Sequence, residues 1–232
     1  MITSPKEHVS VPTKIIQSGN WLTLEFAQAH KILSWAVVNG GMTQSRKIAW
    51  YQVDDQGMGR GINPCMFLKE KLKQKGIEDA VGLLTSADLD SFIDIEKDYA
   101  QHSARCVATV GMSNALRIGD PPALSKHVGT INLVVQLSTP LSEEAFVEAI
   151  AMAAEAKTAA VLESCYPSVC NGLPATGTGT DCIGIAAPIL GDQRQYVGKH
   201  TEIGHLIGAV VYEAVRKGVE QCKKITFGDN LL

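Results

Sequence analysis

The stretch TDCIGIAAPIL, residues 180–190, decides the fold class because it is an apolar run of strand length between two long helical segments. The first helix is predicted from Ser142, a good N-cap, to about residue 164. The second is predicted from about residue 200 to about residue 223. A strand enclosed in this way is typical of a sheet covered by helices.

Further strands precede these helices. Residues 12–55 contain the runs TKIIQSG, WLTLEF, KILSWAVV and RKIAWYQV, with the turn signal NGG at 39–41, and predict successive strands of an antiparallel meander. A helix follows, with Asn63 before Pro64 at its start and Gly76 at its end. Four more runs read as strands: AVGLLTSA, SFIDIEKDY, RCVATVGM and HVGTINLVVQL. We therefore expect one α/β (mixed α+β) domain over residues 1–232, with a mixed β-sheet, an N-terminal antiparallel meander and long covering helices.

Composition excludes several classes of protein. The 232 residues are 45% hydrophobic and carry a formal net charge of −3, so one full core is expected and a nucleic-acid footprint is not. No signal peptide or membrane-spanning run is apparent, which favours a cytoplasmic protein without a membrane partner. The six cysteines lack CxxC spacing, so we expect them to be reduced and mostly buried, with no metal site.

The segment ATGTGTDCIG, residues 175–184, is the most unusual in composition. If it is extended, its side chains alternate between two faces. One face would carry hydroxyls and the other bare backbone beside a carboxylate: Thr176, Thr178 and Thr180 against Gly177, Gly179 and Asp181. The bare face predicts a floor on which a bulky ligand could lie. The alternative is that the glycines serve close packing or a bulge and the threonines simply favour a strand.

The helix predicted from residue 142 presents a lysine on its apolar face. Lys157 falls within the stripe that contains Phe146 and Val161, and a buried ammonium needs a carboxylate or a ligand charge. Lys157 is therefore a candidate catalytic residue, unless its ammonium reaches water along the protein surface. Glu155, on the opposite acidic face, is a further catalytic candidate, although helical periodicity favours a solvated position for it.

A histidine and two glycine-bearing loops complete the candidates. His200 is predicted on the buried side of the first turn of the last helix, where it could act as a base or hydrogen-bond acceptor, or be a core histidine. Asparagine side chains in the two loops could hydrogen-bond to amides of a ligand. Alternatively, they could serve only to stabilise turns. The binding candidates in these loops are Asn39, Gly40, Gly41 and Asn114.

Taken in order, several segments resemble the adenosylcobinamide amidohydrolase family of corrinoid-salvage enzymes. They run from about residue 33 to about residue 215: LSWAVVNGG, GLLTSA, ATVGMSNALRIGD, GTINLVVQLSTPLSEEAFVEAI, EAKTAAVLE, ATGTGTDCIGIAAP and YVGKHTEIGHLIGAVVYEAV. The sequence departs from the family pattern at Trp35, Ala154 and Cys182. These departures concern substrate preference more than the class of reaction.

The resemblance implies hydrolysis of the amide that joins the aminopropanol arm of adenosylcobinamide to a corrin propionate, giving adenosylcobyric acid for cobalamin biosynthesis. The corrinoid is then the substrate and partner, no cofactor is implied, and a homodimer is compatible with the sequence. Our mechanistic hypothesis makes Asp181, held by His200, the base for water or a threonine, with Lys157 or glycine-loop amides stabilising the oxyanion. Asn39 and Asn114 would orient the ring's amides.

Two alternatives remain open. Cleavage before Thr130 would create an N-terminal nucleophile. A non-catalytic corrinoid carrier would instead use His200 or His127 as a cobalt ligand.

Overall fold

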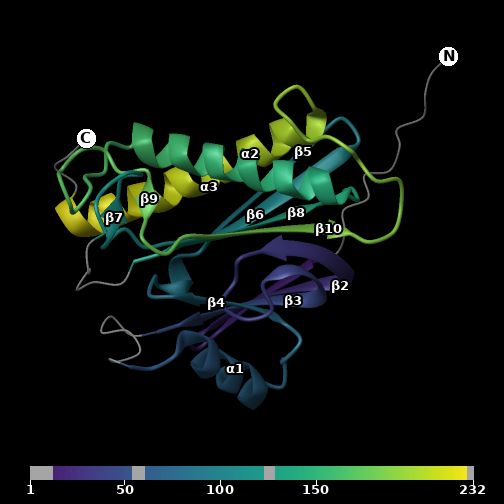
Figure 1. The fold of residues 1–232 in the computed structure, drawn as a ribbon, viewed down its shortest axis with the longest axis horizontal. Coiled ribbons are helices and arrows are strands. Elements are labelled where there is room, and N and C mark those ends of the chain that lie inside the picture. The colour runs from purple at the N-terminus through teal and green to yellow at the C-terminus, as the bar shows by residue number, and fades with distance from the viewer. Residues whose placement is uncertain (1–12, 54–60, 123–128, 229–232) are drawn as a thin grey trace.

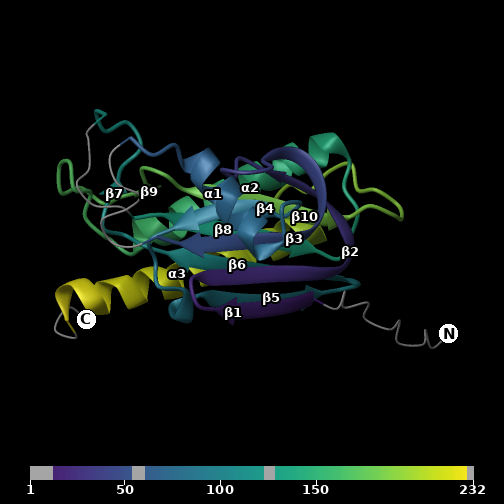
Figure 2. The ribbon, with the colours of Figure 1, turned by 90° about the horizontal axis from the view of Figure 1, so that it is seen from below.

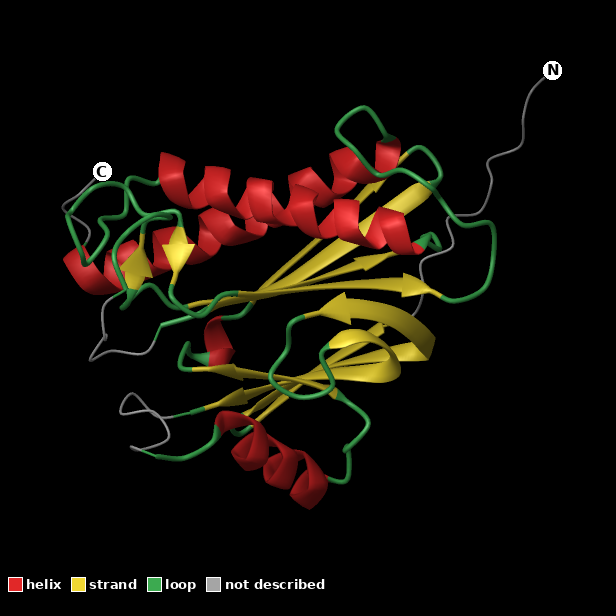
Figure 3. Cartoon of the chain, in the orientation of Figure 1, coloured by secondary structure: helices red, strands yellow, loops and turns green. Residues whose placement is uncertain are grey.

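The computed structural model describes residues 13–53, 61–122 and 129–228. The strands are β1 (Thr13–Ser18), β2 (Trp21–Ser34), β3 (Gly41–Gln52), β4 (Val81–Thr85), β5 (Ile93–Tyr99), β6 (His102–Val110), β7 (Ala115–Leu116), β8 (Ile131–Leu137), β9 (Gly177–Thr178) and β10 (Cys182–Pro188). The α-helices are α1 (Pro64–Lys75), α2 (Glu143–Glu163) and α3 (Glu202–Phe227), and the 3-10 helix η1 spans Leu89–Ser91. The predicted α/β class with a mixed sheet is confirmed (Figure 3).

The main sheet has the strand order β4-β3-β2-β10-β8-β6-β5, with β1 also paired to β2. β1, β2 and β3 pair in antiparallel fashion, as the predicted meander requires, whereas β3–β4 and β8–β10 are parallel. One detail of the prediction is wrong: WLTLEF and KILS belong to a single strand, β2. The pairing of β2 with β3 shifts register between Glu25 and His30, so an irregularity interrupts the strand where the sequence suggested an end.

The sheet bends where β2 meets β10, and its two halves face each other. Figure 1 shows α2 and α3 above the half formed by β10, β8, β6 and β5, and α1 below the half formed by β2, β3 and β4. A core cluster joins the facing surfaces, with Trp50 and Leu83 from one half and Val134 and Ala186 from the other. Figure 2 shows α1 from below, on the outer side of that second half. Apolar clusters thus lie between each helix layer and its half of the sheet, and between the two halves.

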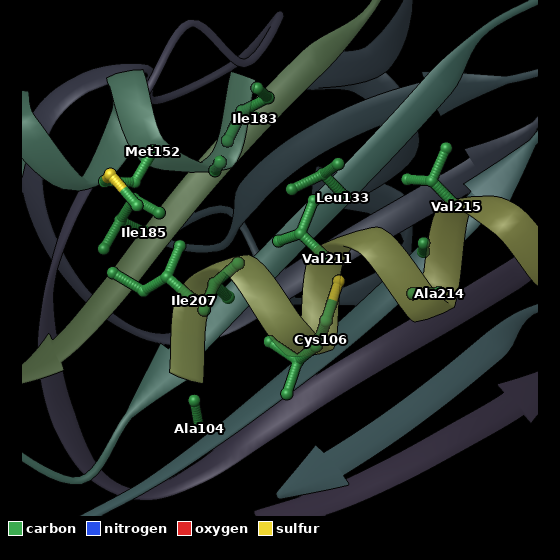
Figure 4. Packing of buried hydrophobic residues seen from close by; sticks show 14 of the residues in the cluster. Ala104, Cys106, Leu133, Met152, Ile183, Ile185, Ile207, Val211, Ala214 and Val215 are labelled. Atoms are coloured by element: carbon green, nitrogen blue, oxygen red, sulfur yellow. The ribbon is translucent and has the colours of Figure 1, made fainter. Parts of the chain in front are cut away.

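The largest core lies between the sheet and the two long helices. Ile183, Ile185 and Leu133 project from β10 and β8 towards Ile207 and Val211 of α3 (Figure 4). Each such side chain that is fully buried contributes about 1.5–3 kcal/mol to stability. This packing holds α2 and α3 firmly against the strands that carry the candidate site.

The ends of α1 and the start of α2 follow the predicted capping residues. Ser142 caps α2 through the Ala145 N–H, and Asn63 caps α1, which ends at the left-handed Gly76. α3 begins at Glu202, close to the expected start near residue 200, with Thr201 as its N-cap. No helix in the described part of the chain combines the length and apolarity needed to cross a bilayer.

The cysteines are free thiols, but most of them are not buried. Cys106 and Cys182 are buried, Cys165 and Cys170 are exposed, and the other two are half-buried. The expectation of mostly buried cysteines is therefore wrong, because Cys165 and Cys170 lie in the loop between α2 and β9 rather than in a regular element.

The connection from β8 through α2 to β10 positions the site. β8 and β10 are adjacent and parallel, so both strands start at the same edge of the sheet. α2 returns the chain between them, which brings its C-terminal half back over those starts. Residues just before β8, just before β10 and late in α2 are thereby brought together.

Candidate active site

A cleft of about 250 Å³ lies at this edge, between the two halves of the sheet. Its walls come from the segment after β2, the C-terminal end of β4, the start of α1, and the starts of β8 and β10. The lining residues are Trp35, Val37, Val53, Pro64, Leu83, Leu84, Thr85, Ser86, Thr130, Asn132, Thr180, Asp181 and Cys182. Asp181 is the carboxylate in this lining, so it is placed where an attacking water or hydroxyl could meet it.

Asp181 closes a tight turn onto Thr178. Its Oδ1 accepts hydrogen bonds from the Thr178 hydroxyl at 2.5 Å and from the Thr178 N–H at 3.1 Å. The N–H of Ile131, the first residue of β8, also donates to Oδ1 at 3.1 Å. The carboxylate therefore links the start of β10 to the start of β8 and is held in one orientation.

Lys157 is the charge partner of this carboxylate. Its Nζ donates to Asp181 Oδ2 and, at 3.3 Å, to the carbonyl of Thr176. The side chains of Lys157 and Asp181 are 10% and 12% exposed, so the pair is largely removed from water. The expectation that Lys157 is buried on the apolar face of α2 is confirmed. Lys157 does not contribute to the cleft lining and lies behind Asp181.

The glycine segment does not form the open floor that its pattern predicts. It is extended only at β9, and residues 179–180 turn, so Thr178 faces Asp181 instead of pointing away from it. Gly177 is buried, and a Cβ there would overlap both Asp181 Oδ2 and Lys157 Nζ. The ion pair therefore occupies the space that a side chain at Gly177 would need. A Cβ on Gly179 would make ordinary contacts, at 3.5 Å to Leu116 and 3.6 Å to Asn114.

Two threonine hydroxyls meet at the cleft. Thr130 Oγ1 and Thr180 Oγ1 are 2.5 Å apart, and Thr180 Oγ1 also donates to the carbonyl of Gly129 at 3.1 Å. Thr130 is buried and Thr180 is exposed. Because Thr180 donates its only hydroxyl proton to the Gly129 carbonyl, the Thr130 hydroxyl is the donor in the hydrogen bond between the two threonines.

The other threonine of the segment, Thr176, has a structural role. Its hydroxyl accepts from the Ile118 N–H at 2.8 Å, beside the short ladder of β7 and β9. This ladder packs the loop that contains Asn114 against the glycine segment. Asn114 is 6% exposed, and its Oδ1 has no hydrogen-bond partner among the described residues. It lies beside Gly129 and Gly179, outside the cleft lining.

Trp35 and Cys182 form the wall next to Asp181. The indole Nε1 of Trp35 donates to the backbone carbonyl of Asp181 at 2.6 Å, which fixes the ring over the turn. Burial, together with the nearby Asp181 charge, raises the pKa of the Cys182 thiol to about 12. Cys182 is therefore protonated at neutral pH and is not suited to act as a thiolate nucleophile.

His200 and Glu155 lie away from this arrangement. His200 is exposed in the turn before α3, so the prediction that it faces the core is wrong. The donors to the Asp181 carboxylate in the described structure come from Lys157, Thr178 and Ile131, and His200 is not among them. Glu155 is exposed and forms an ion pair with Lys199 on the surface, as the solvated alternative required. Neither residue lines the cleft.

The loop at residues 37–41 is a structural turn. Asn39 has a left-handed φ of 55°, and its Nδ2 donates to the carbonyls of Glu78 and Ala80 at 2.9 and 2.8 Å. A Cβ on Gly40 would approach the Ala36 carbonyl to 2.6 Å, and Gly41 has a φ of 82°. The candidate binding residues of this loop are thus occupied by turn formation and stand outside the cleft.

The described residues include no group of three or more His, Cys, Asp or Glu side chains placed to hold a metal ion. His127, the alternative cobalt ligand, lies outside the described residues.

Asn132 and Trp35 line the cleft, although neither is among the site residues predicted from the sequence. Asn132 is 1% exposed and donates from Nδ2 to the Leu84 carbonyl at 2.7 Å across the two sheet halves. The run TINLVVQL carried a usable signal, since polar residues at 130, 132 and 136 alternate along an otherwise apolar strand. Trp35 offered no comparable local signal, because its hydrogen bond reaches 146 positions along the chain.

Comparison with known proteins identifies the family. The family model described as adenosylcobinamide amidohydrolase matches residues 5–227. An adenosylcobinamide amidohydrolase of Methanosarcina mazei is 32% identical, over 79% of this chain and 87% of that protein, and one of Halobacterium salinarum is 28% identical, over 78% and 77%. Among solved structures, the PH0078 protein from Pyrococcus horikoshii OT3 has 8% identity and a TM-score of 0.42, with 91% of this chain and 83% of that chain covered. The chain belongs to the adenosylcobinamide amidohydrolase family and is a hydrolase of an amide bond.

Proposed function

We propose that this protein hydrolyses the amide between the aminopropanol arm of adenosylcobinamide and a propionate of the corrin ring. The products are adenosylcobyric acid and 1-aminopropan-2-ol, and the acid re-enters cobalamin assembly. Family membership supports the reaction class. The observation that carries the proposal at the level of the site is a rigidly held carboxylate, Asp181, beside two hydroxyls in a cleft.

Asp181 serves in this proposal as the group that receives the proton of the attacking water. Lys157, rather than His200, is its charge partner, and the ammonium holds the carboxylate in its orientation. Lys157 is thus a positioning residue, since it faces Asp181 Oδ2 and the Thr176 carbonyl and not the cleft.

The hydroxyls of Thr130 and Thr180 contact each other and line the cleft together with Asp181. As the amide carbon becomes tetrahedral, its oxygen gains negative charge and needs hydrogen-bond donors. Thr130 donates to that oxygen once its hydroxyl turns from Thr180 to the substrate, because one O–H donates one hydrogen bond at a time. The departing amine takes the proton that Asp181 received, so the base ends the cycle as a carboxylate.

The proposal predicts that the protein releases free 1-aminopropan-2-ol from adenosylcobinamide, measured by mass spectrometry of the reaction mixture. The variant Asp94→Asn is a suitable control, because Asp94 pairs with Arg105 on the edge strand β5 and is absent from the cleft lining. It should match the wild-type rate. Tight corrinoid binding without release of the amine would instead establish a carrier and contradict hydrolysis.

A different route to a nucleophile starts from the same hydroxyls. Thr130 Oγ1 could attack the Gly129 carbonyl, whose oxygen already accepts a hydrogen bond from Thr180. The new C–O bond would replace the Gly129–Thr130 C–N bond, with the hydroxyl proton passing to the freed amine. Water would then hydrolyse the ester and leave Thr130 as an N-terminal nucleophile. The contact between Thr180 and Gly129 is the observation that favours this route.

The two routes differ in the mass of the active protein. Asp181-directed attack by water leaves one chain of 24.9 kDa, whereas self-cleavage before Thr130 produces two fragments. We expect intact-mass measurement of active enzyme to give the single chain. Stoichiometric cleavage at Gly129–Thr130 that Thr130→Ala abolishes would overturn the water mechanism.

A further inference from the structure

We infer that the corrin macrocycle of the substrate stays outside the cleft, against an apolar rim centred on Trp35, while the amide-bearing arm alone enters. The inference rests on the proposed function, since it takes the corrinoid as the ligand. It assigns recognition of the macrocycle to the rim and recognition of the arm to the cleft.

The size of the cleft requires this division. Pockets that bury most of a drug-sized ligand have volumes of roughly 300–1,000 Å³. The cleft here is about 250 Å³, and a corrin ring with its peripheral amides and axial ligand exceeds a drug-sized molecule. A flexible aminopropanol arm and its amide bond fit the available space, so the ring must remain at the mouth.

The mouth is apolar on the side of α1 and of the segment after β2. Trp35 is 51% exposed and Val37 is 37% exposed, and both line the cleft. Pro64, at the start of α1, continues the lining. Apolar side chains gathered at the mouth of a polar site are typical of a surface that binds an apolar ligand.

Trp35 is preorganised for stacking. Its Nε1–H is satisfied by the Asp181 carbonyl, so the ring is held without a free polar edge that a ligand would have to desolvate. A ring already fixed loses little conformational freedom when a flat ligand lies on it. The same hydrogen bond sets the distance between the stacking surface and the carboxylate, and thereby aligns the arm with Asp181.

The test uses cobyric acid, which has the macrocycle but lacks the arm. Calorimetry should show that wild-type protein binds it and that Trp35→Ala weakens binding by about tenfold, the loss expected for one aromatic contact. Trp35→Phe keeps an aromatic surface without the N–H and should stay within a few fold of wild type. Tyr196→Ala removes another exposed aromatic ring, outside the cleft lining, and should have no effect.

Kinetics supply a second measurement. Trp35→Ala should raise KM for adenosylcobinamide with a much smaller change in kcat, since the ring contact exists before and during the reaction. Unchanged affinity for cobyric acid in Trp35→Ala would overturn the inference, as would an equal loss in Trp35→Phe, which would assign the effect to the hydrogen bond. Binding that depends on Trp35 without any release of aminopropanol would support the rim and contradict the proposed hydrolysis, so the two failures are distinguishable.

Discussion

Replacement of Asp181 by asparagine is expected to lower kcat by about a hundredfold or more, because the amide cannot accept the proton of the attacking water. The same change should destabilise the protein by about 3–5 kcal/mol, since it leaves the Lys157 ammonium largely buried without its carboxylate. Activity and stability should therefore fall together. Steady-state kinetics and urea unfolding measure the two losses separately.

A double variant separates chemistry from folding. Lys157→Met removes the buried charge and fills a similar volume, so Asp181→Asn combined with Lys157→Met should recover much of the lost stability. Activity should stay low in the double variant if Asp181 is the base. Recovery of activity together with stability would show that Asp181 only holds the turn, and would remove it from the proposed mechanism.

The second large effect is expected at Gly177. A Cβ there would overlap both members of the buried ion pair, so Gly177→Ala must displace Lys157 or Asp181. Overpacking of this kind costs about 1–3 kcal/mol, and the disturbed ion pair adds to that loss. We expect Gly177→Ala to lower kcat at least tenfold, because a misplacement of a reacting group by about 1 Å can cost about a hundredfold in rate.

Gly179 provides the matched control for this prediction. It lies two positions along the same segment, and an added Cβ would make only ordinary contacts with Leu116 and Asn114. Gly179→Ala should keep its stability and most of its activity, measured by thermal unfolding and by aminopropanol release. Equal effects of the two substitutions would contradict the view that Gly177 is required for close approach of the ion pair.

Local sequence signals predicted most of the fold. The capping residues Ser142 and Asn63 and the terminator Gly76 act within one helical turn, so they could be read directly from the chain. The prediction of two strands in place of β2 was wrong because long-range pairing, rather than a local signal, decides where this strand ends. Its irregularity between Glu25 and His30 interrupts the apolar pattern without ending the strand, because pairing with β3 resumes in a shifted register. Strand order depends on such long-range pairing and could not be predicted.

The candidate site was predictable in part. The apolar face of α2 required a counter-charge for Lys157, and Asp181 is that counter-charge. The sequence did not reveal that the two residues meet behind Gly177, because this contact depends on the turn at residues 179–180. His200 was misplaced because α3 starts after Thr201, which moves the histidine into an exposed turn. Residues joined across the two sheet halves, such as Asn132 and Leu84, had no shared local pattern.

The bend at β2 has a mechanical consequence for how substrate is admitted. β2 pairs with β3 along one side and, from His30 to Ser34, with β10 along the other, so backbone hydrogen bonds of one strand connect both walls of the cleft. Rigid bodies that swing about a loop hinge are the usual means of enclosing a large ligand. Among the described residues, β2 joins these walls directly rather than through a loop, and moving them apart would break backbone hydrogen bonds. A bulky substrate must therefore bind at an entrance whose backbone shape is already set. Only side chains and surface loops can then move to fit it.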